Sequence, residues 1–145
     1  VQLFTHIYQL KLIPPTGYIY MKNIAETYWK RKKMPIPHLL LSDYEGRNVW
    51  SHKGIVHWRG MNICMVTDGY WRNKSATNLL DIDYMYLCKG YKGEIAPLQK
   101  LFHIKRIVLD ASLGDYKSKA YKEECKTLGL DYIDISEKGS FRILL

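Results

Sequence analysis

The second half of the chain alternates short apolar runs with longer amphipathic segments. The runs "YMYLC" (residues 84–88), "KRIVLD" (105–110) and "DYIDIS" (131–136) have the length and composition of buried strands. Between them, "EIAPLQKLFH" (94–103) and "DYKSKAYKEECKTLG" (115–129) carry apolar residues at helical spacing. This order of strand, helix, strand, helix, strand predicts parallel strands joined by right-handed crossovers.

A series of short strands precedes this part. The segments "NVWS" (48–51), "GIVHWRG" (54–60) and "NICMVTDG" (62–69) predict an antiparallel meander, in which "RGMN" joins the last two strands as a hairpin. At the other end of the chain, "EKG" predicts a turn and "SFRILL" (140–145) a closing strand. The last two strands are therefore expected to form a C-terminal hairpin.

The beginning of the chain has a weaker pattern. Residues 3–13 alternate as one half-buried strand does, and "PPTG" and "YIYM" (14–21) predict a turn and a short strand. Residues 22–33 have helical spacing that ends at "MPIP", and "HLLLS" (38–42) predicts another strand. The elements together predict an α/β (α+β) fold with a mixed sheet, in one domain of residues 1–145 whose first 53 residues are assigned least well.

Composition agrees with a globular domain. The 145 residues are enough for one hydrophobic core, and the contents of 47% hydrophobic and 25% charged residues are ordinary. No stretch reaches the roughly 18 apolar residues that a membrane-spanning helix needs. The chain begins at Val1 and enters a strand-like pattern at once, so we expect it to be part of a longer protein.

The formal net charge of +8 favours an anionic partner, either nucleic acid or an acidic membrane surface. The alternative is that the charge serves solubility alone. The basic run "KRKK" (30–33) leaves a similar choice: it either ends a helix, where cations offset the helix dipole, or contacts DNA or anionic lipid.

The three cysteines, Cys64, Cys88 and Cys125, have neither disulfide-like nor zinc-ribbon spacing. Cys64 and Cys88 are expected to be small apolar residues in strands. The strand period and one helix face then predict the core. It is expected to contain Val66, Met85, Leu87, Ile107, Leu109, Ile133 and Ile143, with Tyr121, Cys125 and Leu128 packed upon the sheet.

Two lysines and two glycines in "CKGYKG" (88–93) follow the apolar run that ends at Leu87. Loops at the carboxyl ends of parallel strands form the usual ligand crevice of open α/β sheets. Lysines there could hold a phosphate, and a tyrosine could stack on a base; the alternative is a solvated turn. The candidate DNA contacts are Arg72, Lys74, Lys89, Tyr91 and Lys92.

From Gly54 onward the chain resembles the metallo-β-lactamase-like domain that ends ComEC-type competence proteins. "NICMVTDG" stands where that family has a hairpin ending in a "TGD"-like turn, and "LCKGYKG" stands where it has an "HHGS"-like loop. "IKRIVLDASLG" and "GLDYIDISEKGSFRILL" match the strands and loops that follow. "LCKGYKG", "IVLDAS" and "SEKGS" resemble the degenerate form found in Bacteroides-type relatives.

The resemblance implies a partial metallo-β-lactamase-like layered fold and a place in the inner-membrane channel that passes single-stranded DNA during natural transformation. It also implies a soluble domain on the extracytoplasmic face, beside the membrane channel part of the parent protein. The family's domain is thought to degrade the other DNA strand, and such a reaction uses metal ions held by imidazoles and carboxylates.

That metal site is incomplete in this sequence. The motif H-x-H-x-D-H does not occur, and Cys88 and Lys89 stand at the "HHGS" position. A rearranged zinc site of Cys88, Asp68, Asp110 and His57 is one interpretation; in the other, Cys88 belongs to the core and the two aspartates cap turns. We expect no metal and no cofactor. The positions of a former active site are Asp68, Gly69, Cys88, Lys89, Gly90, Asp110 and Ser112.

Three functions are consistent with these observations. The favoured one is a non-catalytic module of a DNA-uptake channel that binds or guides single- or double-stranded DNA, or packs against the channel. The second is a metal-dependent nuclease with a rearranged site, against which the missing histidine motif counts. The third is a purely structural or interaction domain.

Overall fold

The computed structural model describes residues 2–6, 9–13, 30–31, 33, 38–40 and 43–139, with side chains for residues 30, 31, 33 and 43–139. The chain forms two compact units, residues 1–44 and residues 45–145. Gly54, where the family resemblance begins, lies in the turn between two paired strands, so the main sheet also includes strands that precede this residue.

The first unit contains three antiparallel strands, β1 (Gln2–His6), β2 (Gln9–Ile13) and β3 (His38–Leu40), in the order β2-β1-β3. The strand predicted at "HLLLS" is confirmed. The single strand predicted over residues 3–13 is wrong, because the chain reverses and His6 pairs with Gln9. The alternation of polar and apolar residues continues through both strands and therefore does not mark the turn.

Lys30 and Arg31 are helical, as predicted. The rest of the predicted helix over residues 22–33, apart from the turn at Lys33, lies outside the described residues. So do the turn and the strand predicted over residues 14–21.

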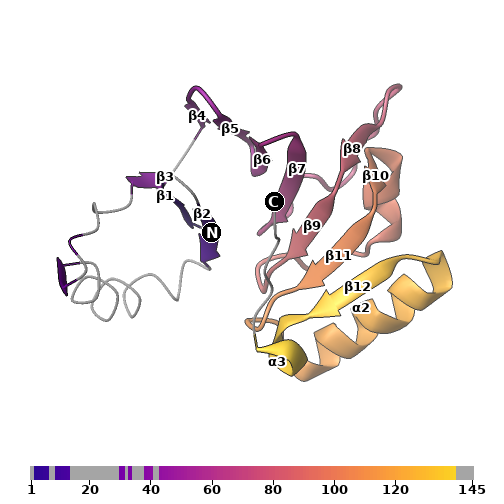
Figure 1. Cartoon of the computed structure of the whole chain (residues 1–145). Helices are drawn as coiled ribbons and strands as arrows, with labels where there is room; N and C mark the ends of the chain where they lie inside the picture. The colour runs from indigo at the N-terminus through magenta and orange to yellow at the C-terminus, as the bar shows by residue number, and fades with distance from the viewer. Residues whose placement is uncertain are drawn as a thin grey trace. The chain divides into compact units, whose positions relative to one another are not determined.

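The second unit is built on a seven-stranded mixed sheet of order β12-β11-β9-β7-β6-β5-β4 (Figure 1). Its antiparallel half is the predicted meander. The strands are β4 (Tyr44–Glu45), β5 (Val49–His52), β6 (Ile55–Trp58) and β7 (Met61–Val66). Two-residue turns join β5 to β6 and β6 to β7, and Gly54 and Gly60 supply the positive φ angles, +80° and +78°, that such turns require.

The other half is parallel, as predicted. β9 (Tyr84–Leu87) pairs in parallel with β7 on one side and with β11 (Arg106–Leu109) on the other, and β11 pairs in parallel with β12 (Asp131–Asp134). The mixed α+β class is thereby confirmed. Its relation to the metallo-β-lactamase-like layered fold stays a prediction.

Two further strands were not predicted. β8 (Leu80–Ile82) and β10 (Phe102–Ile104) form a parallel pair that continues β9 and β11 beyond a break in each strand (Figure 1). Asp83 and Lys105 stand at the two breaks, and Lys105 Nζ lies 2.6 Å from Asp83 Oδ1. The helix predicted over residues 94–103 is correspondingly shorter, a 3₁₀-helix η2 (Ala96–Lys100), because Phe102 already belongs to β10.

Helix α2 (Asp115–Leu128) is confirmed, including its stop at Gly129, which has a φ of +66°. One face of the sheet packs against α2 and η2 in a single hydrophobic core. All the described residues of the predicted core are buried except Leu128, which is partly buried; Ile143 lies outside the described residues.

The C-terminal hairpin requires a correction. The residues predicted as the turn "EKG" belong to or end a short helix, α3 (Ile135–Lys138), because Asp134 caps it through Oδ1, which accepts a hydrogen bond from Ser136 N at 2.8 Å. The strand predicted to begin at Asp131 therefore ends at Asp134. The closing strand "SFRILL" lies outside the described residues.

Candidate functional site

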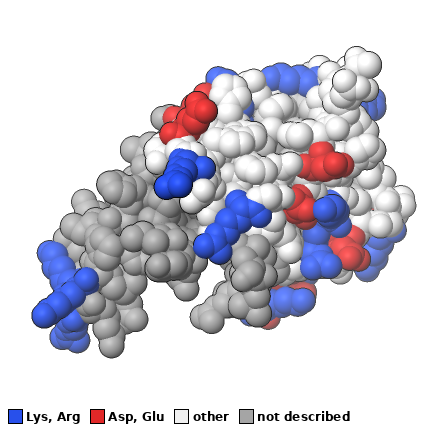
Figure 2. Space-filling model, turned by 45° about the horizontal axis from the view of Figure 1, so that its top comes forward, with Lys and Arg blue, Asp and Glu red and all other residues white. Residues whose placement is uncertain are grey.

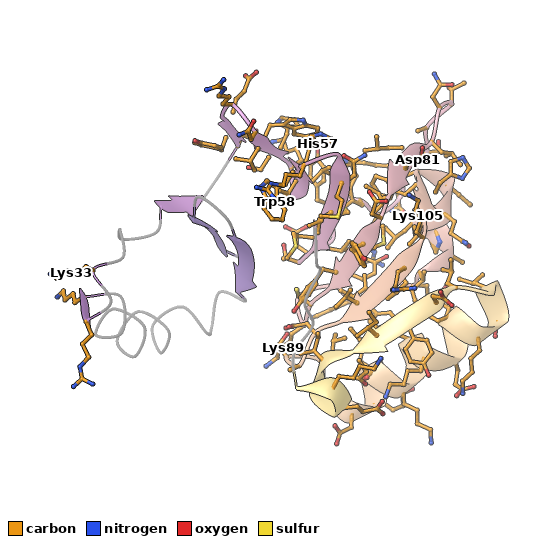
Figure 3. The ribbon with its side chains drawn as sticks, viewed as in Figure 1. Lys33, His57, Trp58, Asp81, Lys89 and Lys105 are labelled. Carbon is orange, nitrogen blue, oxygen red and sulfur yellow. The ribbon has the colours of Figure 1, made fainter. Side chains whose placement is uncertain are left out.

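The parallel strands end level with one another. Val66 of β7 pairs with Leu87 of β9, Leu87 pairs with Leu109 of β11, and Leu109 pairs with Asp134 of β12. The loops that follow β7, β9 and β11 therefore begin along one edge, called here the carboxyl edge (residues 67–74, 88–93 and 110–112). The loop after β7 then leads away from this edge, because Trp71 packs against Phe102 at the start of β10 and Ala76 N donates to Lys100 O at 3.2 Å. The predicted gathering of these strand ends is confirmed. Figure 3 shows Lys89 at this end of the sheet, and His57 and Asp81 at the other end.

Backbone contacts join the three loops closely. Cys88 N donates to Val66 O at 3.1 Å, and Lys89 N donates to Ser112 Oγ at 3.2 Å. Gly90 is pressed against the first loop: a Cβ atom at this position would lie 1.8 Å from Thr67 O. Only glycine allows this approach, so the loop after β9 has a fixed place between its two neighbours.

Each of the two aspartates of the carboxyl edge caps the turn in which it stands. Asp68 Oδ1 accepts a hydrogen bond from Tyr70 N at 2.8 Å, and Asp110 Oδ2 accepts one from Ser112 N at 3.1 Å. The other oxygen of Asp110, Oδ1, accepts from Tyr86 Oη at 3.0 Å. The interpretation of both aspartates as turn caps is confirmed.

Cys88 is part of the core, with 4% of its surface exposed. Burial, together with the negative charge of Asp110, raises the pKa of the Cys88 thiol to about 12. Near neutral pH this sulfur is therefore a protonated thiol, which is a poor metal ligand and a poor nucleophile. The interpretation of Cys88 as a small apolar residue is confirmed.

The remaining member of the rearranged zinc site lies elsewhere. His57 belongs to β6, where its Nδ1 donates to Asn62 Oδ1 at 2.7 Å, and Asn62 stands at the beginning of β7, away from the carboxyl edge (Figure 3). Among residues 43–139 and the few others described, no group of three or more His, Cys, Asp or Glu residues has the geometry of a metal site. The fold does not bring the four residues of that hypothesis together.

Four basic side chains of the carboxyl edge are exposed, namely Arg72, Lys74, Lys89 and Lys92. Arg72 N donates to Gly69 O at 3.0 Å and so closes a backbone turn within the loop after β7. Within the described residues, the carboxylates that form ion pairs all lie outside the carboxyl edge. In the described part of the chain, none of the four forms one of these ion pairs, and Lys74 Nζ lies over the Tyr70 ring.

Tyr91 does not have the exposure that base stacking requires. It is 2% exposed, and its ring lies parallel to that of Tyr121 with centroids 6.4 Å apart. Its hydroxyl donates to Glu94 O at 2.6 Å, and burial, with the charge of Glu124, raises the pKa of Tyr91 to about 12. Tyr91 is thus a core residue that fixes the loop, and its predicted contact with a base does not fit the structure.

The sequence-based prediction missed two residues at this edge. Tyr70 is 42% exposed and directly follows the Asp68–Gly69 turn, and Lys53 Nζ lies 5.7 Å from the centroid of the Tyr70 ring. Lys53 comes from the turn between β5 and β6, which lies beside Met65 near the end of β7. The antiparallel pairing of β6 with β7 brings the turn before β6 to the end of β7. The predicted meander could therefore have placed Lys53 near this end.

Figure 2 shows charged side chains of both signs on the described part of one face. In the part of the chain that the structure describes, no helix has the length and apolar character needed to cross a bilayer.

Comparison with known proteins gives one family. The family model described as the ComEC C-terminal domain matches residues 5–145. Neither the curated proteins nor the solved structures gave a match.

Proposed function

Because the chain belongs to the family of ComEC C-terminal domains, we propose that it is a non-catalytic module of the DNA-uptake machinery of competence and that it contacts DNA through its carboxyl edge. The observation that carries the proposal is the set of four exposed cations, Arg72, Lys74, Lys89 and Lys92, on loops that are fixed to one another. Phosphate contacts supply most of the affinity in DNA binding that is independent of sequence.

The rigidity of the edge supports this role. Lys89 has its backbone N–H on Ser112 Oγ, and Gly90 rests against Thr67. A cation on a fixed loop loses less conformational entropy when it binds a phosphate than one on a flexible loop. The buried turn cap Asp110 lowers the local positive potential, so we expect weak binding, in the micromolar range or weaker at physiological salt.

Three positions of the former active site are occupied in ways that support a non-catalytic role. Cys88 is a buried thiol with a raised pKa. Asp110 uses both carboxylate oxygens within the protein, and Asp68 Oδ1 is taken by the Tyr70 N–H. A nuclease of this family would need such oxygens for metal ions and water.

We infer the domain's location from its family. ComEC proteins are membrane proteins, and we place this domain beside the channel part of its parent, on the extracytoplasmic face. DNA that reaches the channel would then meet the carboxyl edge without being cut.

The test is a binding titration of the 145-residue chain with fluorescently labelled single-stranded and duplex DNA at low salt. Binding should weaken steeply as salt rises and should not depend on base sequence. The double variant Lys89→Ala, Lys92→Ala should weaken binding by roughly tenfold, because each lost phosphate contact removes a released counterion.

The matched control is Lys119→Ala with Lys126→Ala, which removes the same charge from α2, outside the carboxyl edge. Lys117 is unsuitable because its Nζ donates to Gly93 O at 3.1 Å and so supports the loop itself. If neither form of DNA binds at low salt, or if both double variants weaken binding equally, the DNA contact at this edge is wrong. Metal-dependent cleavage of either substrate would instead establish the nuclease.

A further inference from the structure

We propose that Tyr70 is a stacking platform for an unpaired base, so that the carboxyl edge prefers single-stranded to duplex DNA. This inference rests on the proposed DNA contact and adds the residue and the form of DNA that the edge selects. The starting observation is that Tyr70, on the loop that follows β7, is a large aromatic side chain with 42% of its surface exposed and with the ammonium groups of Lys53 and Lys74 near its ring.

A backbone hydrogen bond and a neighbouring aromatic ring hold Tyr70 in place. Its backbone N–H donates to Asp68 Oδ1 at 2.8 Å. The Trp71 ring packs edge-on against it, with centroids 4.7 Å apart, and Trp71 in turn packs edge-on against Phe102 at 5.2 Å. Phe102 is buried in the core. A chain of aromatic contacts therefore connects the exposed ring to the core, and a fixed ring loses little entropy when a base stacks on it.

Two cations accompany the ring. Lys74 Nζ lies 3.2 Å from the centroid of the Tyr70 ring, and Lys53 Nζ lies 5.7 Å from it. A lysine over an exposed ring contributes less than a base stacked on an aromatic side chain. An incoming base would therefore displace the Lys74 ammonium from the ring, and that ammonium could then bind a phosphate adjacent to the stacked nucleotide.

This combination of an exposed ring and adjoining lysines is the chemistry by which proteins bind single strands without reading sequence. In a duplex, both faces of each base are covered by neighbouring base pairs, so a protein ring cannot stack without breaking the helix. Tyr70 therefore adds affinity for a single strand and adds none for a duplex, whereas the lysines act on both.

The experiment measures binding of the 145-residue chain to a labelled oligothymidine of about twelve nucleotides, within the range that such sites span. Tyr70→Ala should raise the Kd for this strand roughly tenfold and leave the Kd for duplex DNA unchanged, while Tyr70→Phe should keep the strand affinity within about twofold. For a strand of the same length that has phosphates but no bases, Tyr70→Ala should have no effect.

Trp50→Ala is the matched control, because Trp50 is similarly exposed, at 39%, but pairs with His57 towards the other end of the sheet. It should leave the single-strand Kd unchanged. Circular dichroism verifies that each variant is folded, and in the wild type the Tyr70 ring resonances should shift upfield when the strand binds.

Two results would overturn the inference, and they are distinguishable. If the single strand binds wild type and Tyr70→Ala equally while the Lys89, Lys92 variant binds it weakly, the phosphate contact stands and the stacking is wrong. If wild type binds neither single strand nor duplex, the proposed function fails and the stacking fails with it.

Discussion

At the scale of single residues, the carboxyl edge depends on positions where the side chain is small or turned inward. Gly90 lets the loop after β9 touch the backbone of Thr67, and Cys88 fills the core below it. Tyr91 anchors the far side of the same loop through its ring contact with Tyr121. The exposed lysines are therefore presented by a loop whose other residues are committed to packing.

The first residue-scale prediction concerns Gly90. A Cβ at this position would lie 1.8 Å from Thr67 O, so Gly90→Ala forces two backbone segments apart. We expect a loss of roughly 2 to 4 kcal/mol in the free energy of unfolding, measured by urea denaturation. DNA binding should also weaken if the fold survives, because the loop shifts.

Gly114→Ala is the control for this prediction. A Cβ there meets no atom within 4 Å, and the φ of −70° suits any residue. Its cost should stay below about 1 kcal/mol, since it affects only the N-cap of α2. Equal stability losses in the two variants would contradict the close packing of Gly90.

At the scale of elements, Asp134 joins three of them. It ends β12 and is 3% exposed. Ser118 Oγ of α2 donates to its Oδ2 at 3.0 Å, and Lys122 Nζ, also from α2, lies 2.5 Å from the same oxygen. Its Oδ1 accepts from the backbone N–H of Ser136 and caps α3. One carboxylate therefore fixes both helices to the edge of the sheet.

The element-scale prediction is that Asp134→Asn lowers the free energy of unfolding by about 3 kcal/mol near neutral pH, because it removes a buried carboxylate charge from its pair with the partly exposed Lys122. Burial by itself would raise the pKa of Asp134, but the hydrogen bonds from Lys122, Ser136 and Ser118 lower it overall. A carboxyl group with a lowered pKa stabilises the fold above its unfolded pKa of about 4, and this contribution is lost as the pH falls further.

Urea denaturation of wild type and Asp134→Asn at about pH 7 and about pH 3 measures this effect, and the difference between the two proteins should shrink at the lower pH. Asp131→Asn is the control on the same strand, since its side chain is 74% exposed and its pair with Arg106 spans 3.4 Å. That change should cost less than about 1 kcal/mol. A difference that does not depend on pH would contradict the role of the Asp134 charge.

At the scale of the whole molecule, the second unit has one core that contains its cysteines. Burial raises the pKa of the Cys64 and Cys88 thiols to about 12 and that of Cys125 to about 11. No disulfide links them. The stability of the unit therefore depends on three thiols that remain protonated while the protein is folded.

The whole-molecule prediction follows from the sign of these shifts. The folded pKa values lie above the ordinary thiol value, so this stability is fully present below about pH 9 and is lost as the pH rises towards the folded values. At about pH 10 each thiol should lower the free energy of unfolding by about 1 kcal/mol, because the unfolded chain has released the thiol proton while the folded chain retains it. Urea midpoints measured from about pH 7 to about pH 10 should fall accordingly, and Cys125→Ala should make the decline less steep. A midpoint that stays constant across this range would contradict the burial of the thiols.

The sequence by itself determined the features that depend on local signals. Strand-length apolar runs and glycine-containing turns predicted the meander and the parallel strands, because alternation and turn chemistry are properties of neighbouring residues. The turn caps at Asp68 and Asp110 were predictable for the same reason, since each side chain bonds an N–H two residues along the chain. The carboxyl edge followed from the common direction of the strands.

Only the tertiary structure decided which aromatic residue of the edge is exposed. Tyr70 and Tyr91 are the same residue type in similar loops, but Tyr121, distant in sequence, covers Tyr91 and donates a hydrogen bond to its carbonyl at 3.2 Å. In the same way, Ser118 and Lys122 of α2 hold Asp134, which caps α3 where the sequence pattern predicted a turn. Burial and capping of this kind depend on partners brought together by folding, and the period of a short segment contains no information about them.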